Sequence, residues 1–170
     1  TLLEKNLSPL TKVIKGNVLD IGGRKRGNIK WHELEVDSYK TLDINRKYSP
    51  DIVCDILDFN TSEKFDTILL LEVIEHLDKP EETLRKIFSL LNSSGNLIIS
   101  VPFMFPIHAD PSDYQRYTEF KLKKILSKNE FTKIKISRFG GPISVYCNIY
   151  TLFCFKYKFL LILFPIYFLL

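Results

Sequence analysis

Short apolar runs alternate with amphipathic or turn-rich stretches along most of the sequence, and this alternation constrains the fold more than any other feature. Each run has the length of a buried strand, typically about four to eight residues. The runs predict five strands, at residues 17–22, 39–44, 52–55, 65–72 and 95–101. Strands that alternate with helices predict an α/β fold with a doubly wound, mostly parallel sheet. In such a sheet, ligands bind outside the carboxyl ends of the strands.

The segment between the last two of these strands has the pattern of a helix. Pro80, Glu81 and Glu82 open it, and all three are favoured in a first helical turn. Apolar residues then recur at helical spacing until residues 92–95 stop the helix. A further helix is predicted at residues 120–127, and residues 131–137 alternate apolar and polar side chains as a half-exposed strand would.

The composition predicts one domain followed by an apolar segment. A chain of 170 residues, 45% of them apolar, can bury one substantial core. From residue 139 onward the only charged residues are Lys156 and Lys158, so we divide the chain into a ligand-binding domain at residues 1–138 and a C-terminal segment at residues 139–170. The uncharged stretch after Lys158 contains Pro165 and is shorter than the roughly twenty residues that span a bilayer. Core completion, an oligomer contact and association with a membrane surface all remain open for this segment.

Charge and cysteine content narrow the partners and the compartment. The net charge of +4 is spread without an arginine-rich block, so we predict no nucleic-acid partner. Three cysteines in apolar surroundings favour free thiols and a reducing cytoplasm, and the N-terminal residues do not read as a secretory signal. Peripheral attachment to a membrane through the apolar segment is the alternative location.

Gly22 and Gly23 follow the first apolar run and predict a turn at which the backbone approaches a ligand closely. A dinucleotide and S-adenosylmethionine both suit such a turn, but a pyrophosphate favours cations, whereas a sulfonium and an ammonium favour carboxylates. Asp20 precedes the turn, and Arg24 stands where the dinucleotide motif needs its second glycine. Both observations favour S-adenosylmethionine over the cofactor of an oxidoreductase.

Further acids end the next two predicted strands. Asp43 lies about twenty residues after the glycine turn, a spacing at which a carboxylate can accept both hydroxyls of a ribose. Asp55 is placed to accept from an adenine amino group, and Ile56 to stack on the ring. Each acid alone is typical of a solvated loop, but three in register at consecutive strand ends indicate a binding site.

At residues 17–137 the sequence resembles the class I S-adenosylmethionine-dependent methyltransferases, in the group called type 11-like or type 23-like. The most specific stretch is residues 65–77, which resembles that family's fourth strand and the Glu-His-Leu turn after it. Residues 95–102 resemble its fifth strand. The resemblance implies a Rossmann-like class I methyltransferase fold and an enzyme that uses S-adenosylmethionine.

The resemblance also implies a role for each acid. Asp20 and the turn at Gly22 and Gly23 would hold the methionine end of the donor, and Asp43 the ribose hydroxyls. The adenine would lie against Asp55 and Ile56. Glu72 would line the donor pocket near the methionine moiety. Arg24 and Arg26 replace the family's further glycines, which keeps a second hypothesis open, a weak or inactive methyltransferase-fold scaffold.

The segment at residues 102–118 resembles one found in bacterial methyltransferases associated with surface polysaccharides. It would overhang the donor and form the acceptor pocket, which predicts methylation of a small-molecule or glycan-like acceptor, with oxygen as the atom methylated. The candidate acceptor-binding residues are Asp110, Asp113, Tyr114 and Arg116.

His108 and His76 are the candidate catalytic bases, because an imidazole can remove a proton near neutral pH. A structural role in the loop or turn is the alternative for each. His108 and Asp110 together supply two metal ligands without a third or fourth, so the sequence predicts no metal site.

Overall fold

The computed structural model describes residues 12–23, 34–108 and 112–156, and the chain divides into two compact units. The first consists of residues 1–103 and 107–136, and the second of residues 104–106 and 137–170. Each unit is described by itself. The loop at Arg24 and Arg26 and the chain after Lys156 lie outside the described residues.

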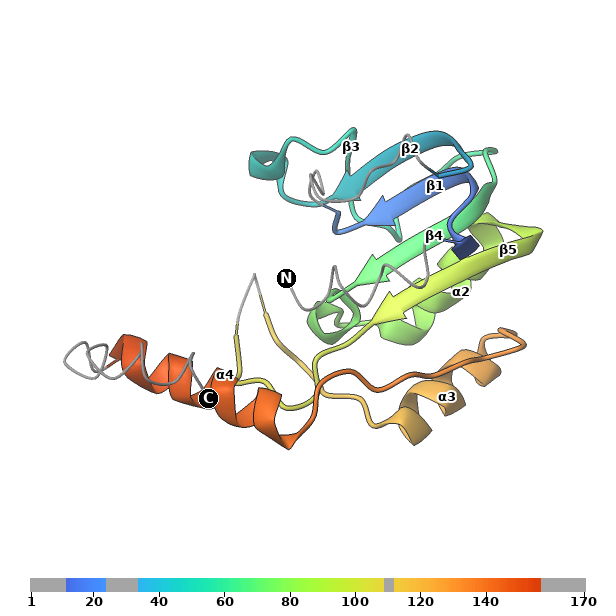
Figure 1. Ribbon diagram of the computed structural model, residues 1–170. Coiled ribbons are helices and arrows are strands. Elements are labelled where there is room, and N and C mark those ends of the chain that lie inside the picture. The colour runs from blue at the N-terminus through green and yellow to red at the C-terminus, as the bar shows by residue number, and fades with distance from the viewer. Residues whose placement is uncertain (1–11, 24–33, 109–111, 157–170) are drawn as a thin grey trace. The chain divides into compact units, whose positions relative to one another are not determined.

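The first unit contains a five-stranded parallel sheet in the order β3-β2-β1-β4-β5 (Figure 1). The strands are β1 (Gly16–Ile21), β2 (Val36–Asp43), β3 (Ile52–Val53), β4 (Phe65–Leu71) and β5 (Leu91–Ser100). Every pairing is parallel, with Ile21 beside both Leu42 and Leu70. The predicted α/β fold with a parallel sheet is therefore confirmed.

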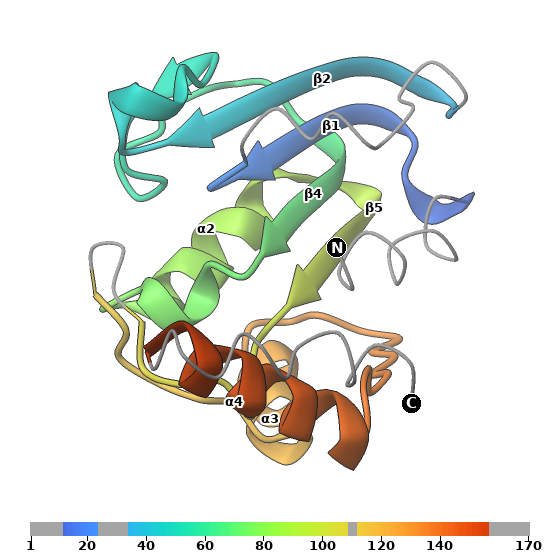
Figure 2. The same ribbon diagram turned by 60° about the vertical axis from the view of Figure 1, so that its left-hand side comes forward.

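The central strands β1 and β4 are buried on both faces, as their continuous apolar runs require. Leu19 and Ile68 face one core, which also contains apolar side chains of α2 (Pro80–Leu90) and α3 (Glu119–Lys128). Val18 and Leu69, which alternate with them, face a second core with Ile14 and Ile98. Figures 1 and 2 show α2 beside β4 and β5.

The boundary between α2 and β5 differs most from the sequence-based expectation. Helix α2 ends at Leu90, and β5 begins directly at Leu91 because Leu91 pairs with Phe65. A shift of register between Phe65 and Thr67 accommodates the polar residues 92–95 within the strand.

The predicted strand at residues 131–137 is wrong, since these residues form no strand. Glu130 and Lys133 have left-handed backbone angles, with φ of 67° and 52°, which interrupt an extended conformation. Phe131 and Ile134 nevertheless pack against the core, so the apolar positions of the alternating pattern are still used. The helix before it, α3, begins at Glu119, one residue before the predicted start, and the Thr118 side chain caps it by accepting a hydrogen bond from the Lys121 backbone amide.

The second unit contains helix α4 (Pro142–Lys156). Within the described residues, no helix combines the length and apolar character needed to cross a membrane. The role of residues 139–170 and the boundary at residue 138 remain predictions.

Candidate active site

The predicted donor residues gather at the carboxyl edge of the sheet. Asp20 lies one residue before the end of β1, Asp43 is the last residue of β2, and Glu72 follows β4. Because β2, β1 and β4 are neighbours and parallel, the three carboxylates come from adjacent strand ends. Asp55 lies two residues after β3, at the same edge.

The glycine turn is tightly packed at both of its residues. Gly22 has a φ of +67°, and its amide donates to the Leu42 carbonyl at 2.7 Å. A Cβ on Gly22 would lie 2.5 Å from Cγ2 of Val73, and one on Gly23 would lie 2.3 Å from Cγ of Asp20. A side chain at Gly22 would therefore displace Val73, and one at Gly23 would displace the Asp20 carboxylate.

Asp20 is fully buried, and its Oδ2 accepts a hydrogen bond from the Tyr39 hydroxyl at 2.8 Å. The carboxylate is thus oriented by β2 and covered by the turn at Gly23. Its place inside the strand end agrees with the expected position, while its contact with a donor remains a prediction.

The ribose and adenine residues differ in accessibility. Asp43 is half-buried, and its Oδ1 accepts from the Asn45 amide at 2.7 Å. Asp55 is exposed and accepts from the Leu57 amide at 2.8 Å. Ile56 is only 4% exposed and belongs to the hydrophobic core, so its stacking on adenine also remains a prediction.

Glu72 adopts a left-handed backbone conformation, with a φ of 56°. Its amide donates to the Ser100 carbonyl at 3.1 Å, and the Ser100 hydroxyl donates to its Oε1 at 2.6 Å. A non-glycine residue in this region costs about 1–3 kcal/mol and persists where surrounding contacts hold it, often at functional sites. Contacts from β5 therefore hold Glu72 in the loop after β4.

These residues fit a sulfonium-bearing donor. Carboxylates at three adjacent strand ends favour the donor's positive sulfur and ammonium.

A second group of polar residues comes together beyond Glu72. Glu75 and His76 lie in the short 3-10 helix Ile74–His76, and the His76 and His108 rings meet edge to face, with their centroids 4.9 Å apart. Glu75 Oε1 lies 3.7 Å from His76 Nε2. The structure therefore unites the two predicted bases, which are 32 positions apart in the sequence (108 − 76), with a carboxylate.

Glu75 is a site residue that the sequence analysis missed. Its side chain is fully buried, and neither carboxylate oxygen accepts a hydrogen bond from any group in the described part of the chain. Burial, with a further contribution from the charge of Glu72, raises the pKa of Glu75 to about 7. The only signal in the sequence is a glutamate inside an otherwise apolar turn.

Asp113 binds both the His108 backbone and the Arg116 side chain. Both Asp113 oxygens accept from the Arg116 guanidinium, and Asp113 Oδ2 also accepts from the His108 amide at 2.9 Å. These donors, the guanidinium first, hold the pKa of Asp113 well below its usual range. Arg116 is thus paired with Asp113, and its contact with an acceptor remains a prediction.

The other predicted acceptor residues are placed differently. Tyr114 is 56% exposed and accessible to a ligand, while its amide donates to the Glu75 carbonyl at 2.9 Å. Asp110 lies outside the described residues. The buried Tyr117 hydroxyl was not predicted, and burial followed by the charge of Glu75 raises its pKa.

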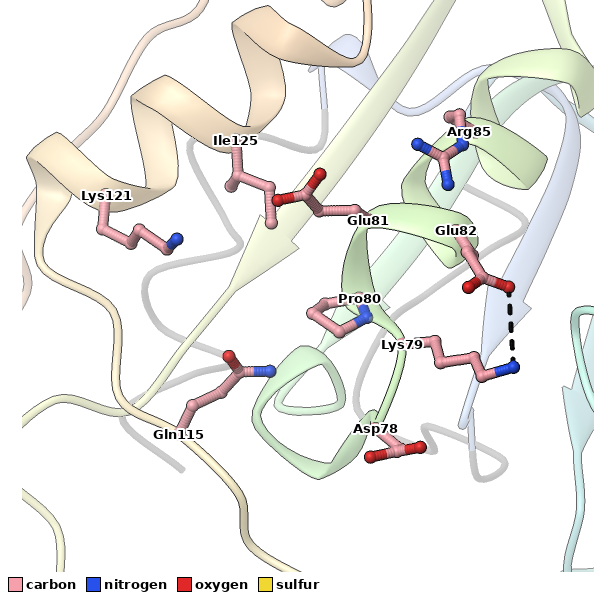
Figure 3. A pocket seen from close by; sticks show the side chains of 9 residues that line it. All are labelled: Asp78, Lys79, Pro80, Glu81, Glu82, Arg85, Gln115, Lys121 and Ile125. Atoms are coloured by element: carbon pink, nitrogen blue, oxygen red, sulfur yellow. Dashed lines mark ion pairs between the residues drawn. The ribbon is translucent and has the colours of Figure 1, made fainter.

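A hollow of about 410 Å³ lies elsewhere, at the start of α2 (Figure 3). Charged side chains line it, including Lys79 and Glu82, which form an ion pair of 3.8 Å. None of the predicted donor or acceptor residues borders this hollow. The strand ends therefore remain the candidate active site.

The family model described as "Methyltransferase domain" matches residues 2–136, far more than half of the chain. The chain belongs to this methyltransferase family. The match includes the glycine turn, the acidic strand ends and the segment after β5. The expected methyltransferase is thereby confirmed, while S-adenosylmethionine as its methyl donor remains a prediction.

Solved methyltransferases share the fold. A SAM-dependent methyltransferase from Archaeoglobus fulgidus is 23% identical, with a TM-score of 0.67 over 84% of this chain and 75% of the other. The 1,6-didemethyltoxoflavin-N1-methyltransferase of Burkholderia thailandensis is 21% identical, with a TM-score of 0.61 over 82% and 70%. A methyltransferase from Mesorhizobium loti is 14% identical, with a TM-score of 0.65 over 82% and 85%. No curated protein sequence matches this methyltransferase significantly.

Proposed function

We propose that this methyltransferase transfers the methyl group of S-adenosylmethionine to a hydroxyl oxygen of a small-molecule or glycan-like acceptor. The observation that carries the proposal is the cluster of Glu75, His76 and His108 beside the donor residues at the carboxyl edge of the sheet. A neutral amine is already a nucleophile, whereas a hydroxyl group becomes a much better one when a general base removes its proton. A cluster of imidazoles and a carboxylate suits that task.

The donor would lie along the strand ends. Asp43 would accept the ribose hydroxyls, Asp55 would accept from the adenine, and the methionine end would lie between the glycine turn and Glu72. When bound, S-adenosylmethionine would supply an electrophilic methyl carbon. The acceptor oxygen would bond to this carbon, the carbon–sulfur bond would break with its electron pair left on sulfur, and the hydroxyl proton would pass to the histidine cluster or to solvent. The protein positions the two reactants, which can supply much of the rate enhancement.

The acceptor would be held by the segment after β5. Tyr114 offers an exposed ring and hydroxyl, and the amide–carbonyl bond to Glu75 ties its backbone to the cluster. The free thiols Cys54 and Cys147 support our further proposal that the reaction occurs in the cytoplasm.

Nitrogen is the competing acceptor atom, because the Burkholderia thailandensis structure is that of an N1-methyltransferase with bound 1,6-didemethyltoxoflavin. A matched panel of alcohols, sugars and amines, assayed for S-adenosylhomocysteine formation, distinguishes the two. Turnover of hydroxyl compounds supports the proposal, and turnover of amines alone contradicts it. Donor binding without any turnover across the panel would favour the scaffold hypothesis.

The donor site itself is tested by calorimetric titration with S-adenosylhomocysteine. We expect Asp43→Ala to abolish measurable binding. Asp37→Ala is the matched control, because Asp37 is an exposed acid near the opposite end of the same strand. Equal affinity in the two variants would refute the role of Asp43.

A further inference from the structure

Glu75, His76 and His108 have the arrangement of an incomplete metal coordination sphere. Each offers one ligand atom, and the three atoms lie within 4.8 Å of one another. Glu75 and His76 are adjacent in the short helix after β4, whereas His108 comes from the segment after β5. The cluster thus depends on the sheet, which brings the two segments to one edge.

The first argument for a cation is the environment of Glu75. This side chain is fully buried, and its two oxygens receive no hydrogen bond from any group within the described residues. A buried carboxylate without donors is costly, and proteins relieve the cost by protonation, ion pairing or metal coordination. His76 Nε2 lies 3.7 Å from Glu75 Oε1, which is too distant for a hydrogen bond, and Arg116 adds a positive charge nearby without donating to either oxygen.

The second argument is the orientation of His76. Its Nδ1 contacts the backbone carbonyl of Ser112 at 2.5 Å, and a carbonyl oxygen can only accept a hydrogen bond. Nδ1 therefore carries the proton, and in the neutral ring Nε2 presents a lone pair toward the Glu75 carboxylate. Two electron-rich atoms that face each other in a buried site are stabilised by a positive charge between them. Metal-binding histidines commonly donate a hydrogen bond from their other ring nitrogen to a backbone carbonyl in the same way.

His108 has the same kind of support from a carboxylate. Its Nδ1 lies 3.3 Å from Asp113 Oδ2, and Arg116 holds Asp113 with both guanidinium nitrogens. The His108 side chain is 37% exposed, while Asp113 is 2% exposed. One ligand of the cluster is thus partly accessible from solvent, so a cation here could keep coordination positions for a substrate.

We propose that Glu75, His76 and His108 bind a divalent transition-metal cation. Two imidazoles with one carboxylate suit zinc, iron, cobalt or manganese rather than calcium or magnesium. Ligands about 2.1 Å from a cation lie roughly 3–3.5 Å from one another. The pair separated by 3.7 Å therefore needs a small adjustment, and the three atoms, which lie within 4.8 Å of one another, would draw together around the cation.

The role of the cation rests on the proposed O-methylation. A hydroxyl bound to a divalent cation has a lowered pKa, so it releases its proton to solvent more readily and becomes a better nucleophile. The cluster would then activate the acceptor through the metal rather than by an imidazole acting as a free base. Asp113 would be a positioning residue, since it acts through His108.

The test is a titration of the untagged, chelator-treated protein with Co²⁺, whose visible absorption reports its ligands. We expect one saturable site, with affinity weakened at least about tenfold in Glu75→Gln and in His108→Gln. His108→Gln changes a partly exposed side chain and guards against misfolding of the buried variant. Glu82→Gln is the matched control, because Glu82 is an exposed glutamate of α2, and it should bind as the wild type does.

Absence of saturable binding, or equal affinity in all three variants, would overturn the proposed metal site. S-adenosylhomocysteine binding is measured in the same chelator-treated samples. If the wild-type protein binds S-adenosylhomocysteine but not Co²⁺, the metal site alone is refuted. If the wild-type protein does not bind S-adenosylhomocysteine, the proposed function is refuted.

Discussion

Substitution of Gly22 by alanine provides a quantitative test of how the glycine turn is packed. At a φ of +67°, alanine costs about 1–2 kcal/mol more than glycine. The new Cβ would also lie 2.5 Å from Cγ2 of Val73, and overpacking of this kind typically costs about 1–3 kcal/mol. Gly22→Ala should therefore lower the free energy of unfolding by roughly 2–5 kcal/mol.

The steric part can be separated by a double-mutant cycle with Val73→Ala. This second substitution removes the methyl group that the new Cβ would meet, so Gly22→Ala introduced into the Val73→Ala protein should add only the backbone cost at position 22. We expect a favourable coupling free energy of about 1–3 kcal/mol, measured by urea unfolding of the four proteins. Effects that add within about 0.5 kcal/mol would refute the contact between the glycine turn and the residue after Glu72.

Other regions of the sheet yield further predictions. Asp66 accepts from the Asn17 amide at 2.9 Å, and this bond, followed by that from Asn92, lowers its pKa. A carboxyl group whose pKa is lower in the folded state stabilises the fold above its ordinary pKa, and this stability is lost as the pH falls through the pKa of the folded state. Asp66→Asn removes the carboxyl group, so the free energy of unfolding should fall less between pH 7 and pH 3 than it does in the wild type. An unchanged pH profile would contradict the assigned bonds. Leu70→Ala should cost about 2–5 kcal/mol in urea unfolding because Leu70 is fully buried, whereas Phe120→Ala, at a side chain that is 78% exposed, should cost much less; similar costs would contradict the described core.

The strand pattern could be predicted because burial on both faces demands continuous apolar sequence. This holds for β1 and β4, whose residues pack into both cores. The segment at residues 131–137 shows the limit of the same reasoning, since alternation specifies which side chains are buried but not whether the backbone joins a sheet. Left-handed angles at Glu130 and Lys133 decide that locally, and neither residue is one that sequence patterns associate with such angles.

The positions of the candidate donor residues could be predicted from the sequence because these residues lie at or directly after strand ends. Asp20, Asp43 and Glu72 occupy the last positions of strands or the position after, and parallel pairing necessarily collects such residues at one edge. Their individual contacts were not predictable. The bond from Tyr39 to Asp20 and that from Ser100 to Glu72 depend on which strands are neighbours and in which register.

The sequence by itself determined the class of fold, the methyltransferase family and the acids at the strand ends, because these properties are encoded in local patterns and their spacing. Only the tertiary structure decided that Glu75 is buried without a hydrogen-bond partner among the described residues and that His76 and His108 share its site. The physical reason is that burial and the meeting of distant side chains arise when separate segments pack, here the turn after β4 against the segment after β5. The same packing brings Asp113 and Arg116, two of the predicted acceptor residues, together with His108.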